Sequence, residues 1–156
     1  MRIRVIAIGQ RLASWVEAGC AEYVTRMPRE WNFDLVTLKS APRVEGKPIA
    51  DAMRAEARAI EASIPQGFWR IALDERGKQV TTAELAGLLR AWRQDARDVA
   101  LIIGGADGLD PSVKESANQT LALSALTLPH GLARLLLLEQ LYRAASLLQG
   151  HPYHRA

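Results

Sequence analysis

The sequence predicts a single α/β domain, residues 1–156, built on a mostly parallel sheet flanked by helices. Strand-like and helix-like segments alternate along the chain, an order typical of strand–helix–strand units. One strand-like segment, Val99–Ile103, is apolar at every position, as expected of a strand covered on both faces. Apolar residues make up 49% of the chain and charged residues 24%, so the chain can form a hydrophobic core.

The apolar pattern in the first half of the chain predicts three strands and two helices. Short apolar runs predict strands at Arg2–Ile8, Phe33–Leu38 and Phe68–Leu73, whereas apolar residues three or four positions apart predict helices at Leu12–Met27 and Ile49–Ile64. The apolar face of the first helix comprises Leu12, Trp15, Val16, Gly19, Cys20, Tyr23, Val24 and Met27. Between the second strand and the second helix, prolines, a glycine and basic residues predict a mobile basic loop over Lys39–Pro48.

The second half begins with a capping box, in which Thr81 and Glu84 satisfy free amide groups at the start of a helix. That helix is expected to bury Leu85, Leu88, Leu89 and Trp92. After the Val99–Ile103 strand, Asp110 followed by Pro111 predicts another helix start. A fifth strand is expected over Leu121–Leu126 and a final helix over Leu132–Gln149.

Charge, cysteine content and the lengths of apolar segments indicate which class of protein this is and where in the cell it is expected. Twenty basic residues against 17 acidic ones give a net charge of +3, and 16 of the basic residues are arginine. Arginine matches phosphate geometry well, although a high-GC genome also favours it. Cys20, the single cysteine, lies on an apolar helix face and is expected to be a buried structural thiol. No apolar segment is long enough for a signal peptide or a membrane span, so we expect a cytoplasmic protein.

Three segments at the carboxyl ends of expected strands are candidates for a ligand site. They are Leu73-Asp74, Gly104-Gly105 and Leu123–Leu128. In parallel sheets ligands bind beyond the carboxyl ends of the strands, where these segments should meet. Neither G-x-G-x-x-G nor G-x-x-x-x-G-K-[ST] occurs in the chain, which argues against a dinucleotide or ATP site.

The final helix is apolar around most of its circumference. Glu139, Gln140, Arg143 and Ser146 form one narrow polar stripe, and leucines and alanines cover the rest. Leaving many leucines exposed would be unfavourable, so we expect a homodimer packed through this helix. The alternative is that the helix is central within one subunit.

Arg134 departs from the pattern of this helix. It lies opposite the polar stripe and in the first turn, where the helix dipole disfavours a cation. We therefore expect it to meet an anion in the active site, either a carboxylate or a phosphate. The alternative is an arginine that reaches water from a frayed first turn.

Four motifs in register resemble one known family. They are Gly104-Gly-Ala-Asp-Gly108, Leu123-Ser-Ala-Leu-Thr-Leu-Pro-His130, Glu139-Gln-Leu-Tyr-Arg143 and His151-Pro-Tyr-His-Arg155. The sequence resembles the RlmH family of SPOUT-class methyltransferases, which methylate N3 of a pseudouridine in bacterial large-subunit ribosomal RNA. The resemblance covers the whole chain. Ala106 stands where many members have proline, and the Lys39–Pro48 loop matches nothing specific.

The resemblance implies a C-terminal trefoil knot that binds S-adenosylmethionine, the methyl donor, without a metal. The positions that match the cofactor site are Leu73, Gly104, Gly105, Leu123, Ser124, Ala125, Leu126, Thr127 and Leu128. The expected substrate is ribosomal RNA, with the assembled ribosome as the favoured form. A non-catalytic ribosome-binding protein of the same fold is the alternative.

The chemistry of the C-terminal residues suggests catalytic roles. His154 is a candidate base, Arg143 and Arg155 are candidate partners for a phosphate or an oxyanion, and Tyr153 could stack on the target base. In a dimer this tail could reach the partner's cofactor loops and form a composite site. The alternative is a disordered basic end. His130, between Pro129 and Gly131, is expected to be a loop or helix-entry residue.

Overall fold

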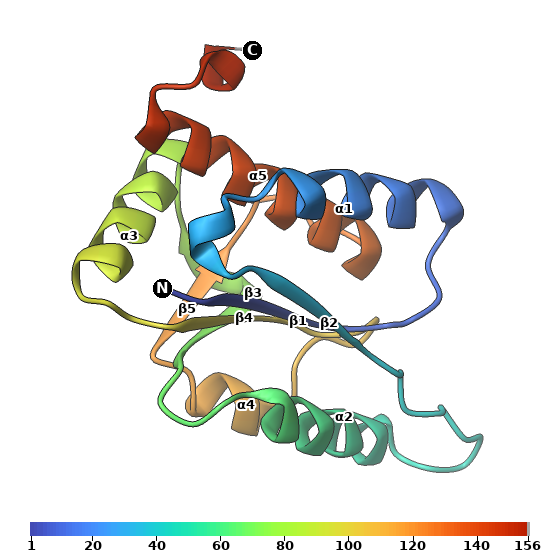
Figure 1. Ribbon diagram of the computed structural model, residues 1–156. Helices are drawn as coiled ribbons and strands as arrows, with labels where there is room; N and C mark the ends of the chain where they lie inside the picture. Colours follow the sequence, from blue (N-terminus) through green and yellow to red (C-terminus); the bar gives the residue numbers. More distant parts are fainter. Residues whose placement is uncertain (156) are drawn as a thin grey trace.

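Five parallel strands form one sheet in the order β2-β1-β4-β3-β5 (Figure 1). This computed structural model describes residues 1–155, and side chains through residue 153. The strands are β1 (Ile3–Ile8), β2 (Asp34–Leu38), β3 (Trp69–Gln79), β4 (Val99–Ile103) and β5 (Gln119–Ala122). The α-helices are α1 (Ser14–Arg26), α2 (Ile49–Ser63), α3 (Thr82–Gln94), α4 (Pro111–Glu115) and α5 (His130–Gln149), and two 3₁₀ turns are η1 (Arg29–Trp31) and η2 (Pro152–Arg155).

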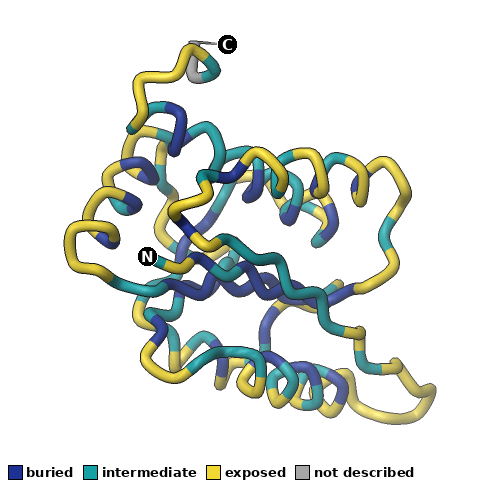
Figure 2. Tube along the Cα trace, viewed as in Figure 1, coloured by how far each residue is buried: buried dark blue, intermediate teal, exposed yellow. Residues whose placement is uncertain are grey.

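Helices cover both faces of the sheet, as the α/β prediction requires. Figure 1 shows α1, α3 and α5 on one face and α2 and α4 on the other. Successive residues of a strand point to opposite faces. In β1, Val5 therefore packs in the core on the α5 side, whereas Ile6 packs with Ile60 of α2. The buried residues are concentrated in the sheet, as Figure 2 shows, and β4 is buried at all five positions.

Two local sequence signals form as predicted. At the start of α3 the Glu84 amide donates to Thr81 Oγ1 (3.2 Å), and the Thr81 amide donates to Glu84 Oε2 (2.7 Å). At the start of α4 the Ser112 amide donates to Asp110 Oδ1 (2.9 Å). These bonds satisfy amide groups that have no partner inside the helix, so the predicted starts are confirmed.

The strands at the far edge differ from the prediction. β3 continues to Gln79 instead of ending at Leu73, and β5 ends at Ala122 instead of Leu126. Leu121 of β5 pairs with both Leu73 and Lys78 of β3. Because β3 curls over β5 in this way, the chain after Ala122 leaves the sheet and becomes a loop.

Glycine allows the close approach of these two strands. A Cβ atom on Gly77 would lie 2.6 Å from the carbonyl carbon of Leu121, too close for any side chain. The knot implied by the resemblance stays a prediction, but β3 and β5 are packed backbone against backbone here.

Two expectations about helix faces are revised. Trp15, expected in the core, is 63% exposed. The final helix, expected to need a partner for its leucines, packs between α1 and α3 and buries Leu137, Leu138 and Leu141 within the chain. The homodimer therefore stays a prediction. Within residues 1–155, no helix is long and apolar enough to cross a membrane.

Candidate functional site

A cavity of about 860 Å³ opens beside the ends of β4 and β5. Its walls come from the three segments that the sequence singled out, although these segments are far apart along the chain. Of the predicted cofactor residues, Leu73, Gly104, Gly105, Leu123, Ser124, Leu126, Thr127 and Leu128 line it. Ala125 is not among the lining residues. The tertiary structure thus brings three loops together at one pocket.

The two glycines shape a turn in the pocket wall. A Cβ on Gly104 would lie 2.5 Å from the carbonyl carbon of Gly108, and one on Gly105 would lie 3.0 Å from Cγ2 of Ile8. The Gly108 amide donates to the Gly105 carbonyl oxygen (3.1 Å) and closes the turn. Packing within the chain therefore requires glycine at position 104, whereas a side chain at position 105 would need Ile8 to shift; the sequence analysis gave both glycines a contact with the ligand.

Charged and polar side chains also line the pocket. Lys114 Nζ donates to Asp74 Oδ2 (3.2 Å), and Thr127 Oγ1 donates to Glu75 Oε2 (3.2 Å). Burial disfavours the charge on Asp74, but hydrogen bonds from the Arg76 amide and Lys114 outweigh burial and hold the pKa of Asp74 below its ordinary value. Lys114 was missed by sequence reasoning because no local pattern relates it to Asp74, 40 positions away.

An exposed apolar surface lies on the loop after β5. Leu126 is 74% exposed, although it lines the cavity with Leu123 and Leu128. The Leu126 amide donates to Ser124 Oγ (2.9 Å), which fixes the loop locally. A large exposed leucine in a concave site is suited to covering by an apolar part of a ligand.

Arg134 lies in the first turn of α5, and the alternative interpretation, an arginine that reaches water, is wrong. It is 3% exposed, so it does not reach water. Its Nη2 donates to the carbonyl oxygens of Ile8 (3.0 Å) and Gly9 (2.7 Å), at the end of β1, and the expected anion stays a prediction. Its Nε is buried without a hydrogen-bond partner among the described residues, and burial lowers the pKa of Arg134. His130 is the first residue of α5, as expected.

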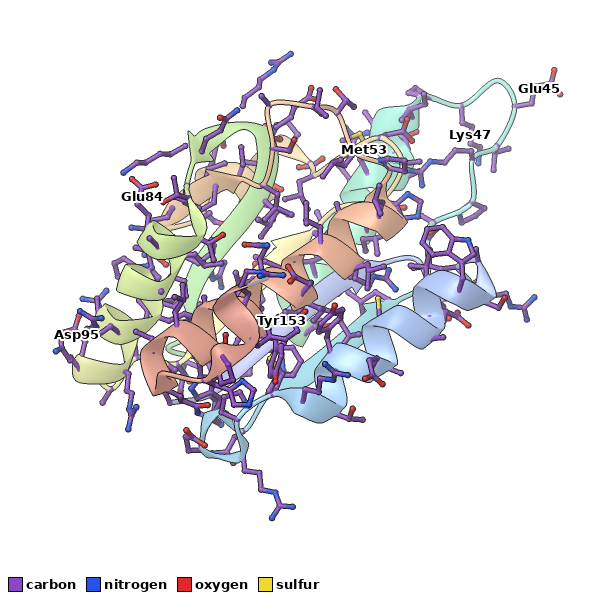
Figure 3. All side chains as sticks on the ribbon, turned by 90° about the horizontal axis from the view of Figure 1, so that it is seen from above. Glu45, Lys47, Met53, Glu84, Asp95 and Tyr153 are labelled. Atoms are coloured by element: carbon purple, nitrogen blue, oxygen red, sulfur yellow. The ribbon has the colours of Figure 1, made fainter. Side chains whose placement is uncertain are left out.

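The tail residue Tyr153 is held by the middle of α5 and by α1. Its hydroxyl donates to Glu139 Oε1 (3.2 Å) and lies 3.0 Å from the hydroxyl of Tyr23. Its ring packs edge-on against Tyr142, with the centroids 4.7 Å apart. Burial, the bond with Tyr23 and the Glu139 carboxylate raise the pKa of Tyr153. In Figure 3 Tyr153 lies between α5 and α1, whereas Met53 of the pocket belongs to α2.

Arg143 belongs to the same cluster. Its Nε donates to Glu139 Oε1 (2.8 Å), and its guanidinium lies 4.9 Å from the centre of the Tyr153 ring. The sequence analysis placed Tyr23 and Glu139 on helix faces but gave neither a role in the site. The side chains of His154 and Arg155, the candidate base and anion partner, lie outside the described residues.

The tail cluster lies along the middle of α5, whereas the pocket is at the first turn of this helix. His130, at the first position of α5, lines the pocket, whereas Tyr153 follows the last position. The tail folds back along α5, however, and Glu139, which accepts from the Tyr153 hydroxyl, is nine positions after His130, or about 14 Å along the helix axis. Within one subunit, Tyr153 and Arg143 are therefore separated from the pocket. Among the side chains that the structure describes, through residue 153, no group of three His, Cys, Asp or Glu residues could hold a metal ion.

Comparisons with known proteins agree with this architecture. The family model described as "Predicted SPOUT methyltransferase" matches residues 1–154. A protein of Methylibium petroleiphilum named "Ribosomal RNA large subunit methyltransferase H" is 52% identical over 99% of both chains. A protein of the same name from Nitrosospira multiformis is 51% identical over the full length of both chains.

A solved structure shares the fold. The crystal structure of a probable methyltransferase from Bordetella pertussis Tohama I aligns with a TM-score of 0.56 and 24% identity over 92% of this chain and 95% of that one. At that identity the likeness concerns the fold alone. Together with the family model and the two relatives, it leads to one conclusion: this chain belongs to the SPOUT methyltransferases and, among them, to the RlmH family that its sequence resembles.

Proposed function

We propose that this protein is a cytoplasmic methyltransferase that transfers the methyl group of S-adenosylmethionine to N3 of a pseudouridine in large-subunit ribosomal RNA. The observation that carries the proposal is a pocket of about 860 Å³ lined by three loops that are distant in sequence. The names of the relatives support ribosomal RNA as the substrate. We further propose that the substrate is the assembled ribosome.

The pocket residues fit a methyl donor of this chemical class. The cavity lies in the size range of small-molecule sites. Leu123, Leu126 and Leu128 offer an apolar surface for an adenine ring, and the backbone of the Gly105–Gly108 turn is accessible at the wall. When bound, S-adenosylmethionine supplies an electrophilic methyl group on a sulfonium.

The work left to the protein is alignment and proton removal. Alignment of the attacking nitrogen can contribute several kcal/mol, on the order of the gains seen in intramolecular reactions. N3 of pseudouridine carries a proton, for which His154 is the candidate base. We propose that Arg143 and Arg155 hold a phosphate or the developing oxyanion and that Tyr153 stacks on the target base.

A homodimer would bring these groups to a pocket. Because the Tyr153 hydroxyl contacts α5 at Glu139, about 14 Å along the helix axis from the pocket residue His130, we propose that the tail acts on the pocket of the partner subunit. Trp15 and Leu132, 63% and 39% exposed at the amino ends of α1 and α5, provide apolar surface for the contact.

Methyl transfer tests the proposal directly. Tritiated S-adenosylmethionine is incubated with ribosomes, large subunits or naked ribosomal RNA from a strain that lacks this protein, and the labelled nucleoside is then identified. We expect label in N3-methylpseudouridine, with the assembled ribosome as the best substrate. Binding to ribosomes without transfer would instead indicate a non-catalytic ribosome-binding protein.

Two tryptophan substitutions test the pocket itself. Ala106 is exposed and lines the cavity, so Ala106→Trp should obstruct it and weaken S-adenosylmethionine binding by at least about tenfold in calorimetry. Ala91→Trp places the same side chain on an exposed position of α3 and should bind normally. Equal affinity of both variants would exclude this cavity as the cofactor site.

A further inference from the structure

Arg43 connects three parts of the chain beside the pocket. It belongs to the 39–48 loop, which the sequence predicts to be mobile. Its Nη1 donates to Glu56 Oε1 (2.6 Å) and to the Ala41 carbonyl oxygen (2.8 Å). Its Nε and Nη2 both donate to Asp107 Oδ2, at 3.0 and 2.8 Å. One guanidinium thus joins the loop, α2 and the turn that forms the pocket wall.

Glu56 fixes one side of this connection. Its side chain is 3% exposed in α2, and Oε1 also accepts the Ala41 amide (3.0 Å). A buried carboxylate is unfavourable without a countercharge, and Arg43 provides it. The hydrogen bonds to Glu56 and Asp107 raise the pKa of Arg43, which therefore stays charged. The guanidinium is held in place by the body of the protein.

Asp107 is on the other side, within the turn of the pocket wall. It lies between Gly105 and Gly108, whose backbones bridge each other, and it lines the cavity. Among the described residues Arg43 is its ion-pair partner. Figure 3 shows the loop, marked by Glu45 and Lys47, projecting on the same side of the molecule as Met53, another lining residue.

We propose that Arg43 is a positioning residue for the cofactor pocket. It acts through Asp107 by holding the Gly105–Gly108 turn against α2, with buried Glu56 as its anchor. The effect on S-adenosylmethionine rests on the proposed function, whereas the effect on the turn does not. Because Arg43 is part of the 39–48 loop, any partner that moves this loop would also alter the pocket wall.

Three variants separate this role from loss of stability. Asp107→Ala breaks only the link to the turn. The pair Arg43→Met with Glu56→Gln removes the anchor without leaving a buried unpaired charge, and Gln can still accept the Ala41 amide. The third variant combines all three changes. A matched control, Arg70→Met with Glu61→Gln, removes an ion pair between β3 and α2 that does not touch the pocket.

Calorimetry with S-adenosylmethionine gives the first result. Asp107→Ala and the Arg43/Glu56 pair should each raise Kd about fivefold. The combined variant should show the same rise of about fivefold in Kd as either one, because each variant breaks the same connection from Glu56 through Arg43 to Asp107. If the two effects were independent, they would multiply to a rise of about 25-fold. A multiplied effect, or a loss confined to Asp107→Ala, would overturn the proposal and make Asp107 a direct cofactor contact.

Hydrogen exchange without cofactor gives the second result. The amides of residues 104–109 should exchange faster in Asp107→Ala and in the Arg43/Glu56 pair, with unchanged exchange in β4 and an unchanged thermal midpoint. The Arg70/Glu61 control should match the wild type. Unchanged exchange at 104–109 would refute the positioning role. If the wild type fails to bind S-adenosylmethionine, the proposed function fails, but this exchange measurement still decides the role of Arg43.

Discussion

Arg134 is a buried cation whose hydrogen bonds go to backbone carbonyl oxygens. Its Nη2 ties the first turn of α5 to the end of β1, where the Ile8 and Gly9 carbonyl oxygens converge. The arginine thus joins the first turn of α5 to the carboxyl end of β1. These bonds indicate that Arg134 stabilises the folded state.

Arg134→Met should lower the free energy of unfolding by about 1–3 kcal/mol, because two carbonyl acceptors lose a charged donor. Urea denaturation measures this loss. Arg90→Met, an exposed substitution on α3, is the control and should change stability little. A fully stable Arg134→Met protein that no longer transfers methyl groups would return Arg134 to the active site.

Asp74 makes the pocket wall sensitive to acid. Its folded-state pKa lies below the ordinary value of 3.8, so its ionised form stabilises the folded state. That stabilisation is present at neutral pH and is lost as the pH falls through the folded-state pKa. Asp74→Asn should be less stable near neutral pH and should lose less stability on acidification below about pH 4. Urea denaturation over a series of pH values measures the stability of both proteins. Parallel curves of stability against pH for the wild type and Asp74→Asn would contradict this prediction.

At the scale of elements, the packing of β3 on β5 depends on a glycine. Gly77→Ala would force a Cβ atom to within 2.6–2.8 Å of the β5 backbone, so we expect a loss of several kcal/mol or a failure to fold. Gly87→Ala is the opposite case. Gly87 lies exposed in α3 with nothing within 4 Å of the added atom, and this change should stabilise by about 0.5–1 kcal/mol. If urea denaturation midpoints of Gly77→Ala and Gly87→Ala changed in the same direction, this expected difference would be contradicted.

At the scale of the whole molecule, the separation of tail and pocket leads to a complementation test. One chain carries Ala106→Trp and an intact tail, and the other has intact loops but ends after Gly150. Each homodimer should be inactive. The co-expressed heterodimer should regain one working site, built from the second chain's loops and the first chain's tail. A heterodimer as inactive as either parent would place the tail within its own subunit or outside catalysis.

The sequence by itself determined the fold class, the order of the elements and the position of the three pocket segments. These depend on local patterns: apolar periodicity, the Thr81–Glu84 capping box, and glycines after a buried strand. The same patterns predicted the pocket because the ends of parallel strands meet at one edge. Family resemblance supplied the methyl donor and the RNA, which no local pattern specifies.

Only the tertiary structure decided the partners of the charged side chains. Arg134 bonds to carbonyl oxygens 125 and 126 positions away, and Arg43 meets Asp107 across 64 positions. The length of β3 was likewise set by its contact with β5 rather than by its own residues. Such contacts depend on how distant segments pack, and a charge in a sequence carries no information about which segment will lie against it.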